Sequence, residues 1–279
     1  MRVEQFSDEY ELIAPHYGMT ASDLRARDQR QGQSVRRWYV IDEQRVVAAA
    51  VPWLRPDDRM FVAFQVEDVR AYRPLTETIG QALGRSVSTM CDDADREHLW
   101  ALREAGFRIE MTDDRFVVPF ASALTLVERA WVPSGYAIRS VSDVDEQRSF
   151  ELDNQIRNLV PGTEGWIGDQ AWFGEELRSP EFDPTAYLIA VEETTDSYVG
   201  LLRIWRNPSG PRLGLIGVLP KHRRVPIAAE LLKQGLTAAS TWGHDTFATE
   251  TSPNNPHTYP RLVRMGMEKV GRFHQLTRP

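Results

Sequence analysis

The spacing of apolar residues in the C-terminal half of the chain alternates between strand-like and helix-like periods. The turn-like TTDS separates two alternating runs, which predicts an antiparallel hairpin. Ile227 and Leu231 begin a helical pattern that closes on Gly243, and a shorter helix is expected with Pro256 at its first position and Gly266 just past its end. We therefore expect strands at 136–141, 186–193, 198–205, 212–219, 245–251 and 267–279, and helices from near Asp143, over 227–243 and within 254–266. The segment 161–184 is broken by Gly and Pro and should be a loop with room for one short helix.

The N-terminal half repeats this order in weaker form. Its last segment, LREAGFRIEMTDDRFVVP, aligns with LVRMGMEKVGRFHQLTRP, which places Gly106 opposite Gly266 and Leu102 opposite Leu262. Such a repeat means one supersecondary plan used twice, and the alternative is a coincidence between two ordinary α+β endings. The predicted break lies near residue 130, giving domains at 1–130 and 131–279. Strands are expected at 38–43, 45–54, 60–66 and 86–91, and helices at 73–83 and 95–107.

Composition and charge exclude several classes of protein. The chain of 279 residues is 42% hydrophobic and 26% charged, with a mean hydropathy of -0.42, which is typical of a globular fold. No apolar run reaches the roughly 18 residues of a membrane span, and the start MRVEQFSDEY lacks the features of a signal peptide, so we expect a cytoplasmic protein without a membrane partner. Cys91, the only cysteine, excludes an internal disulfide. The net charge of -7 argues against a nucleic-acid partner.

The segment IGVLPKHRRVPIAAELL carries the sharpest signal for chemistry. Its strand stops at Pro220 and the chain restarts as a helix after a basic turn. Such a turn points backbone N–H groups and the positive end of a helix at one place, which suits a pyrophosphate, and Arg223 and Arg224 add full charges. The alternative is an ordinary strand-to-helix connection with two solvated arginines.

In this context the sequence resembles the GNAT (GCN5-related N-acetyltransferase) superfamily. The pattern V-x-P-x-x-R-x-x-G-x-G/A of that family reads here as Val218, Pro220, Arg223, Pro226 and Ala228, and the resemblance extends over residues 136–270. The ending of the chain is similar to that of tandem proteins of the mycothiol-synthase type. The resemblance implies an α+β fold with αβα layers, in which tandem GNAT-like domains each have a mixed, mostly antiparallel sheet flanked by helices.

The resemblance also implies acetyl-CoA as the cofactor. Its pantetheine arm would pair with the third large strand, and its phosphates would lie on the turn and helix that follow. The third and fourth large strands, at about 212–219 and 245–251, should splay apart into a V-shaped cleft with Arg223 and Arg224 at one mouth. The implied cofactor-binding residues are Ile216, Gly217, Val218, Arg223, Arg224, Val225, Pro226, Ile227, Ala228, Ala229 and Asn255.

Two residues depart from the family pattern. Pro226 replaces a glycine and removes one N–H that would face a phosphate. Leu262 falls where many members have the tyrosine that protonates the leaving thiolate; His257 and Tyr259 are nearby alternatives, although either can equally be a packed or surface residue. The N-terminal half has acids where a phosphate turn should be positive. We therefore expect it to be degenerate and to bind no cofactor.

The amine acceptor must lose a proton before it attacks a thioester, so a carboxylate base is expected near the sulfur. Glu250 lies where the family often has such a glutamate; Glu192 and Glu193 are alternatives, and Glu250 can instead be an exposed strand carboxylate. The acceptor side should be the loop after the first helix, where aromatic surface and negative charge suit a cationic amine, although the tryptophans can instead pack the loop. The candidate acceptor residues are Glu164, Trp166, Asp169 and Trp172.

These features predict an N-acyltransferase that moves an acetyl group from acetyl-CoA to a primary amine of a small molecule. The alternative is an inactive GNAT-like sensor that binds CoA or another ligand, since the departures at Pro226 and Leu262 fit both. Acetylation of proteins is disfavoured by the acidic, tryptophan-bearing loop, which suits a compact acceptor. No metal site is predicted, and the sequence leaves a monomer and a homodimer open.

Overall fold

Two units, each with its own hydrophobic core, make up the chain in the computed structural model, which describes residues 1–30, 36–264 and 267–279. Unit 1 comprises residues 1–112 and 272–279, and unit 2 comprises residues 113–271. In the described part of the chain, no helix is both long and apolar enough to span a bilayer. The prediction that two folds follow one another along the chain is therefore confirmed at the level of the fold.

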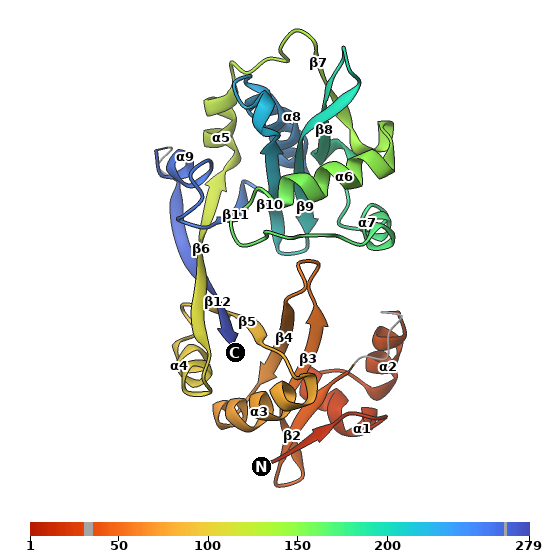
Figure 1. Cartoon of the computed structure of the whole chain (residues 1–279), viewed down its shortest axis with the longest axis vertical. Helices are drawn as coiled ribbons and strands as arrows, with labels where there is room; N and C mark the ends of the chain where they lie inside the picture. The colour runs from red at the N-terminus through yellow and green to blue at the C-terminus, as the bar shows by residue number, and fades with distance from the viewer. Residues whose placement is uncertain (31–35, 265–266) are drawn as a thin grey trace. The chain divides into compact units, whose positions relative to one another are not determined.

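Unit 2 is a six-stranded sheet in the order β7-β8-β9-β10-β11-β6 (Figure 1). Neighbouring strands are antiparallel except for β10 and β11, which are parallel. The strands are β6 (Arg108–Pro119), which enters the unit from residue 113, β7 (Tyr136–Ser140), β8 (Tyr187–Glu192), β9 (Ser197–Asn207), β10 (Gly210–Val218) and β11 (Thr246–Thr251). The helices are α5 (Phe120–Val127), α6 (Glu146–Arg157), α7 (Gln170–Glu176), α8 (Ile227–Ala239) and α9 (Tyr259–Arg264).

Helices cover both faces of this sheet because its central strands are apolar on both sides. Leu188 and Leu202 pack with α5 and α8, whereas Ile189 and Leu201 pack with α6 and α7. This alternation along β8 and β9 is the period of two that a strand imposes. The αβα layering predicted for the domain is confirmed, and the two faces define where a ligand can approach each strand.

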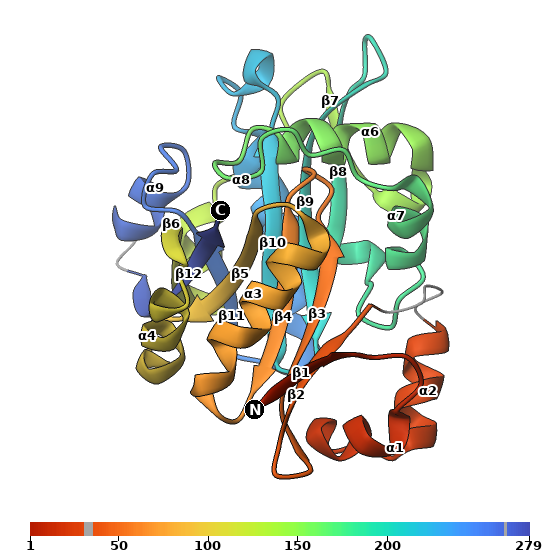
Figure 2. The same ribbon diagram turned by 60° about the horizontal axis from the view of Figure 1, so that its bottom comes forward.

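Unit 1 has the same plan, with the sheet order β1-β2-β3-β4-β5-β12 and α3 packed on one face of it (Figure 2). Helices α1 and α2 pack on the opposite face. The strands are β1 (Arg2–Gln5), β2 (Trp38–Asp42), β3 (Arg45–Leu54), β4 (Met60–Val66), β5 (Val87–Asp92) and β12 (Glu268–Arg278), which enters the unit at residue 272. The helices are α1 (Tyr10–Ile13), α2 (Ala21–Arg30), α3 (Tyr72–Leu83) and α4 (Arg96–Glu104).

The two repeats exchange their last strands. β6, which ends the first repeat, pairs with β11 in unit 2 from Asp114 to Pro119. β12, which ends the second repeat, pairs with β5 in unit 1 from Phe273 to Arg278. The units therefore divide at residues 112 and 272 rather than near residue 130 as we predicted. The expected pairing of Gly106 with Gly266 lies outside the described residues at Gly266.

Two helices begin later than the sequence predicts, and in each case a side chain accepts backbone N–H groups near the start of the helix. Asp145 Oδ1 accepts from the backbone N–H of Arg148 at 2.8 Å, so α6 starts at Glu146 and not near Asp143. Asn255 Oδ1 accepts from the N–H groups of His257 and Thr258, both at 3.1 Å, and α9 begins only at Tyr259. Pro256 thus lies in the turn before this helix rather than at its first position.

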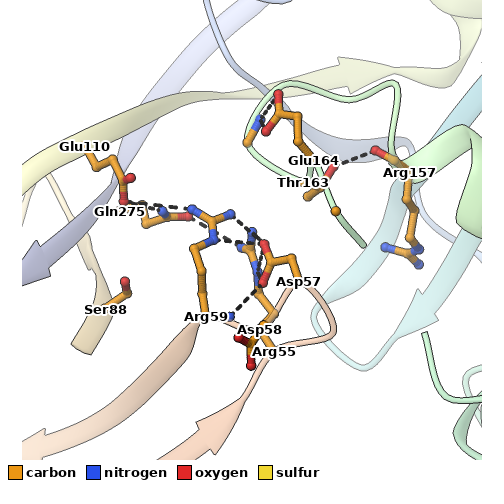
Figure 3. Close-up of polar contacts among 12 residues, drawn as sticks. Arg55, Asp57, Asp58, Arg59, Ser88, Glu110, Arg157, Thr163, Glu164 and Gln275 are labelled. Carbon is orange, nitrogen blue, oxygen red and sulfur yellow. Dashed lines mark hydrogen bonds and ion pairs between the residues drawn. The ribbon is translucent and has the colours of Figure 1, made fainter. Parts of the chain in front are cut away.

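The turn between β3 and β4 is held by an ionic network within unit 1 (Figure 3). Asp57 accepts from Arg55 Nε at 2.9 Å and from Arg59 Nε at 2.8 Å, and its side chain is 1% exposed. Gln275 of β12 donates to Glu110 Oε2 at 3.0 Å and accepts from Arg55 Nη1 at 3.5 Å. The exchanged strand is therefore tied to unit 1 by polar contacts as well as by its backbone.

A second ionic cluster lies buried where α6 and α7 pack on β8 and β9. Arg203 donates to Glu176 Oε2 at 2.9 Å and lies 3.8 Å from Asp153 Oδ2. Asp153 also accepts from Arg157 Nε at 2.5 Å and from the Tyr187 hydroxyl at 3.3 Å. Breaking such a buried pair leaves an uncompensated charge, so these residues fix the position of both helices. The sequence did not single them out, although Asp153 and Arg157 have the i, i+4 spacing of a helical ion pair.

The strand exchange predicts that Leu276 stabilises unit 1 although it lies at the end of the second repeat. Leu276 is fully buried in the core of unit 1. Leu276→Ala should lower the free energy of unfolding by about 2 to 5 kcal/mol through lost burial and a residual cavity. Hydrogen exchange should show lost protection in β5. Val270→Ala, at a position 47% exposed on the same strand, is the matched control; unchanged β5 protection in Leu276→Ala would contradict the exchange.

The buried cluster predicts a pH dependence of stability. Burial, the largest cause, raises the pKa of Glu176 above its ordinary 4.5, although Arg203 and Arg157 act in the opposite direction. The native state then binds the Glu176 proton more tightly than the unfolded chain does. The stabilisation of the native state that results is fully present below pH 4.5, and it is lost as the pH rises above that value. Urea unfolding of Glu176→Gln across this window should lack that slope. Glu175→Gln, at the exposed neighbour, should keep it.

Candidate functional site

A cleft opens in unit 2 because β10 and β11 pair over only two residues. Their parallel pairing is confined to Arg212 with Ala248 and Leu213 with Thr249, after which the strands separate. β10 continues to Val218, roughly 15 Å further along at the usual rise of a strand. A cavity of about 500 Å³ occupies this region, and its walls come from β10, β6, α5, α6, α8 and the segment before and within α9. The predicted splay of these two strands is confirmed.

The turn after β10 forms one mouth of the cleft. A single 3-10 turn, Pro220–His222, follows the strand, and α8 begins at Ile227 with no side-chain cap among the described residues. Arg223 folds back over the strand end, where its Nε donates to the Val218 carbonyl at 3.0 Å and its Nη1 lies 2.9 Å from His257 Nε2. Arg224 is exposed. Both arginines therefore lie on the turn as predicted, but only Arg223 lines the cavity.

The predicted cofactor residues fall into two groups. Pro226 is the exposed residue before α8, and the Ile227 side chain is fully buried in the core, so only the backbone of Ile227 can face a ligand. With the exposed Arg224, they do not line the cavity. The predicted residues that do line it are Ile216, Gly217, Val218, Arg223, Val225, Ala228, Ala229 and Asn255.

The geometry of the cleft fits the extended arm of coenzyme A. Beyond Leu213, β10 has no strand partner on its β11 side in the described part of the chain, so this edge offers backbone groups to an extended ligand. The uncapped start of α8 offers N–H groups and the positive end of the helix dipole to an anion. Arg223 and Arg224 add positive charge at the same end. We expect the free edge of β10 to hold the extended arm, and the start of α8 with Arg223 and Arg224 to hold the phosphates.

Glu250 directly follows the last pair of β10 and β11, at the point where these strands separate, and it is not among the residues that line the cavity. Its Oε1 accepts from Arg115 Nε and its Oε2 from Arg212 Nη2, each at 3.2 Å. A carboxylate offers about four acceptor positions, so each oxygen keeps one for a further donor. The sequence singled out Glu250 but neither arginine. Arg115 lies in the part of the chain that we had assigned to the other domain, and only the strand exchange brings it to β11.

The alternative carboxylates lie elsewhere in unit 2. Glu192 ends β8 at the hairpin, where it accepts from Thr195 Oγ1 at 2.5 Å and lies 4.0 Å from His222 Nδ1. Glu193 follows it, and its backbone N–H donates to Gly135 at 2.9 Å. Both lie at the end of the sheet that carries the basic turn. Glu192 pairs with the first residue of β9, and Gly200, a little further along β9, pairs with Val218 at the end of β10.

The two alternatives to the missing tyrosine differ in their surroundings. Leu262 and His257 line the cavity, and His257 is paired with Arg223. The Tyr259 hydroxyl donates to Asp114 Oδ2 at 2.7 Å, and Asp114 is buried and ion-paired with Lys269 at 2.7 Å. This hydroxyl proton is therefore already engaged, and Tyr259 lies outside the lining of the cavity.

The loop proposed for the acceptor uses its polar residues mainly to hold its own shape. Glu164 accepts from the Gly162 N–H at 2.9 Å (Figure 3), and Asp169 caps α7 by accepting from Trp172 N at 3.0 Å. Trp166 packs under Arg157, whose guanidinium carbon lies 4.8 Å from the ring centroid. Trp172 is 48% exposed and is the more exposed of the two tryptophans.

Unit 1 has an analogous cleft with different chemistry. β4 and β5 pair only at Met60 with Val87 and Phe61 with Ser88, and a cavity of about 570 Å³ follows. Its ionisable lining is Asp92, Asp95, Cys91, Tyr72 and His98, with no arginine or lysine among the described lining residues. Burial, the largest cause, raises the pKa of Cys91 to about 11, so the thiol is protonated at neutral pH. That unit 1 binds no cofactor stays a prediction, and the acidic lining favours it.

Comparisons with known proteins agree with this geometry. Residues 153–267 match the family model described as Acetyltransferase (GNAT) family. A GCN5-related N-acetyltransferase from Sphaerobacter thermophilus is 16% identical with a TM-score of 0.64, covering 99% of this chain and 96% of that one. A tandem GNAT protein from the clavulanic acid biosynthesis pathway, without acetyl-CoA, is 15% identical with a TM-score of 0.64, covering 99% and 98%.

A GCN5-related N-acetyltransferase from Kribbella flavida is 17% identical with a TM-score of 0.56, covering 92% of this chain and 95% of that one. The search of curated proteins gave no match. The family match covers the cleft-forming part of unit 2, and the structural matches cover both units. Residues 153–267 thus match the GNAT acetyltransferase family, and the chain as a whole shares the fold of the tandem GNAT protein.

Proposed function

We propose that unit 2 transfers an acetyl group from acetyl-CoA to the primary amine of a small molecule. The observation that carries the proposal is the cleft between β10 and β11, which has a basic turn at one end and Glu250 at the other. Arg223, Arg224 and the start of α8 would bind the phosphates, and the free edge of β10 would hold the extended arm. The acyl group would then lie at the narrow end of the cleft, next to Glu250.

Acetyl-CoA supplies a thioester, whose C–S bond breaks as the amide C–N bond forms and whose sulfur leaves as the thiol. Glu250 would take the proton that the amine loses, directly or through one water. Its contacts with Arg115 and Arg212, from the neighbouring strands β6 and β10, orient the carboxylate. Protonation of the sulfur would rely on solvent, because Leu262 contributes no acid and Tyr259 is engaged by Asp114.

A thiol-release assay beside calorimetry tests the proposal against the alternative of an inactive sensor. The assay should use a panel of amines that includes amino sugars, aminoglycosides, amino acids and polyamines. Binding of acetyl-CoA together with thiol release by at least one amine supports an acetyltransferase. Binding without any amine-dependent thiol release would favour the sensor, and the absence of binding would contradict both.

Glu250→Gln should separate chemistry from binding. The substitution keeps the shape of the side chain but removes the base, so turnover should fall by about 10²- to 10⁴-fold while the affinity for acetyl-CoA stays nearly unchanged. Raising the pH should partly restore turnover, because a larger share of the amine is then already deprotonated. Glu192→Gln, at a carboxylate near the other end of the strands, is the control. Normal turnover of Glu250→Gln at neutral pH would contradict the assignment.

Arg224→Ala should weaken the binding of acetyl-CoA rather than slow the chemical step. An exposed charge pair contributes up to about 1 kcal/mol, so the KM for acetyl-CoA should rise about threefold to fivefold with little change in kcat. The effect should shrink as salt is added, because the contact is solvent-exposed. Arg139→Ala, at an exposed arginine on β7, is the control. Equal KM values for the two variants would place the phosphates elsewhere.

A further inference from the structure

Three charged side chains meet where the cleft narrows. Glu250 on β11 lies between Arg115 on the neighbouring β6 and Arg212 on the neighbouring β10, with both contacts at 3.2 Å. Two guanidinium groups thus face one carboxylate, and the formal charge of the three groups is positive. The exposed Arg212 brings positive charge to the place where, in the proposed function, the acceptor amine would arrive.

Strand alternation places these groups on the face of the sheet that carries α6 and α7. Successive side chains of a strand point to opposite faces of the sheet. Phe247 of β11 and Leu213 of β10 belong to the core under α5 and α8. Glu250 on β11 and Arg212 on β10 are each an odd number of residues from these positions, so their side chains point to the other face. The acyl arm lies between the strands in our proposal, and the face with α6 and α7 is the side from which an acceptor would approach it. The three charges therefore flank the path of the acceptor.

The guanidinium group of Arg212 has N–H donors that its contact with Glu250 does not use. Its side chain is 42% exposed, and among the described residues its one polar side-chain contact is with Glu250. A guanidinium carries five N–H donors in a planar fork that matches a carboxylate. A second anionic group can therefore bind Arg212 without displacing Glu250. Glu250 itself is 23% exposed and keeps acceptor positions for an ammonium or amine group.

We propose that the acceptor is a zwitterion of the amino-acid class, which carries a carboxylate close to its primary amine. Arg212 binds the carboxylate, and Glu250 binds the amine and removes its proton. This assignment rests on the proposed acetyl transfer. It predicts that polycations such as polyamines and aminoglycosides are not the preferred acceptors, because their further ammonium groups would meet the exposed guanidinium of Arg212.

Matched pairs of amines with and without the carboxylate test the assignment. Suitable pairs are lysine with cadaverine, ornithine with putrescine, and phenylalanine with phenethylamine, each assayed by thiol release with acetyl-CoA. The wild-type enzyme should have a kcat/KM at least tenfold higher for the carboxylate member of the pairs it accepts. Equal values, or a preference for the decarboxylated members, would overturn the proposal.

Arg212→Gln separates recognition of the acceptor from orientation of Glu250. If Arg212 binds the carboxylate, the KM for the carboxylate member should rise about tenfold or more, while the values for its decarboxylated partner change little. If Arg212 only orients Glu250, kcat should fall equally for both members, and the proposal fails. Arg212→Lys keeps the charge without the fork and should be intermediate, and Arg139→Gln is the control. Unchanged acetyl-CoA affinity by calorimetry shows that each variant is folded.

Direct binding gives a readout that needs no turnover. In thermal-shift titrations, the carboxylate members should stabilise the wild-type protein and not Arg212→Gln, whereas the decarboxylated members should stabilise neither. The absence of a carboxylate-dependent shift, or thiol release by polyamines or aminoglycosides alone, would overturn the acceptor class and leave acetyl transfer intact. Failure of acetyl-CoA to bind would instead count against the proposed function itself.

Discussion

The early separation of β10 from β11 is the constraint on which the rest of unit 2 depends. Two parallel strands that stay paired satisfy each other's backbone groups, so a separation after Leu213 leaves an edge that needs another partner or solvent. The apolar walls from α5, α6 and α8 close around that edge and make it a cavity. Gly217 at this point is closely covered, since an added Cβ would lie 2.4 Å from Ile156 of α6. The backbone of β10 and the helix that covers it therefore leave no room for a side chain there.

Charge is distributed along the cleft in a way that the splay makes possible. The basic turn follows the free end of β10, and the Arg115, Glu250 and Arg212 group lies where pairing stops. In the proposed function, a ligand that pairs with the strand edge would run from the basic turn at its anionic end toward the Glu250 carboxylate at its reacting end. The same framework in unit 1 splays at the equivalent strands but has Asp92 and Asp95 in its lining, so the architecture alone does not create an anion site.

Local patterns predicted the order of the elements because the signals that start and stop them are local. Pro220 ends β10 and Gly243, with φ of 83°, follows the last turn after α8, as their residue types indicate. Strand partners were not predictable in this way. β6 and β12 end equivalent repeats, and nothing in their own sequences says which sheet each one joins. The boundary near residue 130 was displaced for that reason, and Arg115 was missed with it.

Side-chain roles were harder to predict than elements. Glu250 lies directly after the last pair of β10 and β11 and contacts Arg212, but it does not line the cavity, and its use as a base stays a prediction. Asp169 and Glu164 were read as acceptor contacts because they are acidic and lie near tryptophans. Each instead satisfies a backbone N–H of its own loop, which is the commonest use of short acidic residues next to a helix start or a glycine turn.

The surroundings of Tyr259 bear on how the reaction can end. Its hydroxyl donates to Asp114, a buried carboxylate that also binds Lys269, so moving it toward the cleft would leave a buried charge short of one hydrogen bond. Leu262 fills the place of a donor with an apolar side chain. A thiolate is a tolerable leaving group when a positive dipole faces it, and the start of α8 supplies such a dipole on the same side of the cleft. In the proposed reaction, deprotonation of the amine by Glu250, rather than protonation of the sulfur, would therefore be the step to which a side chain of this protein contributes most.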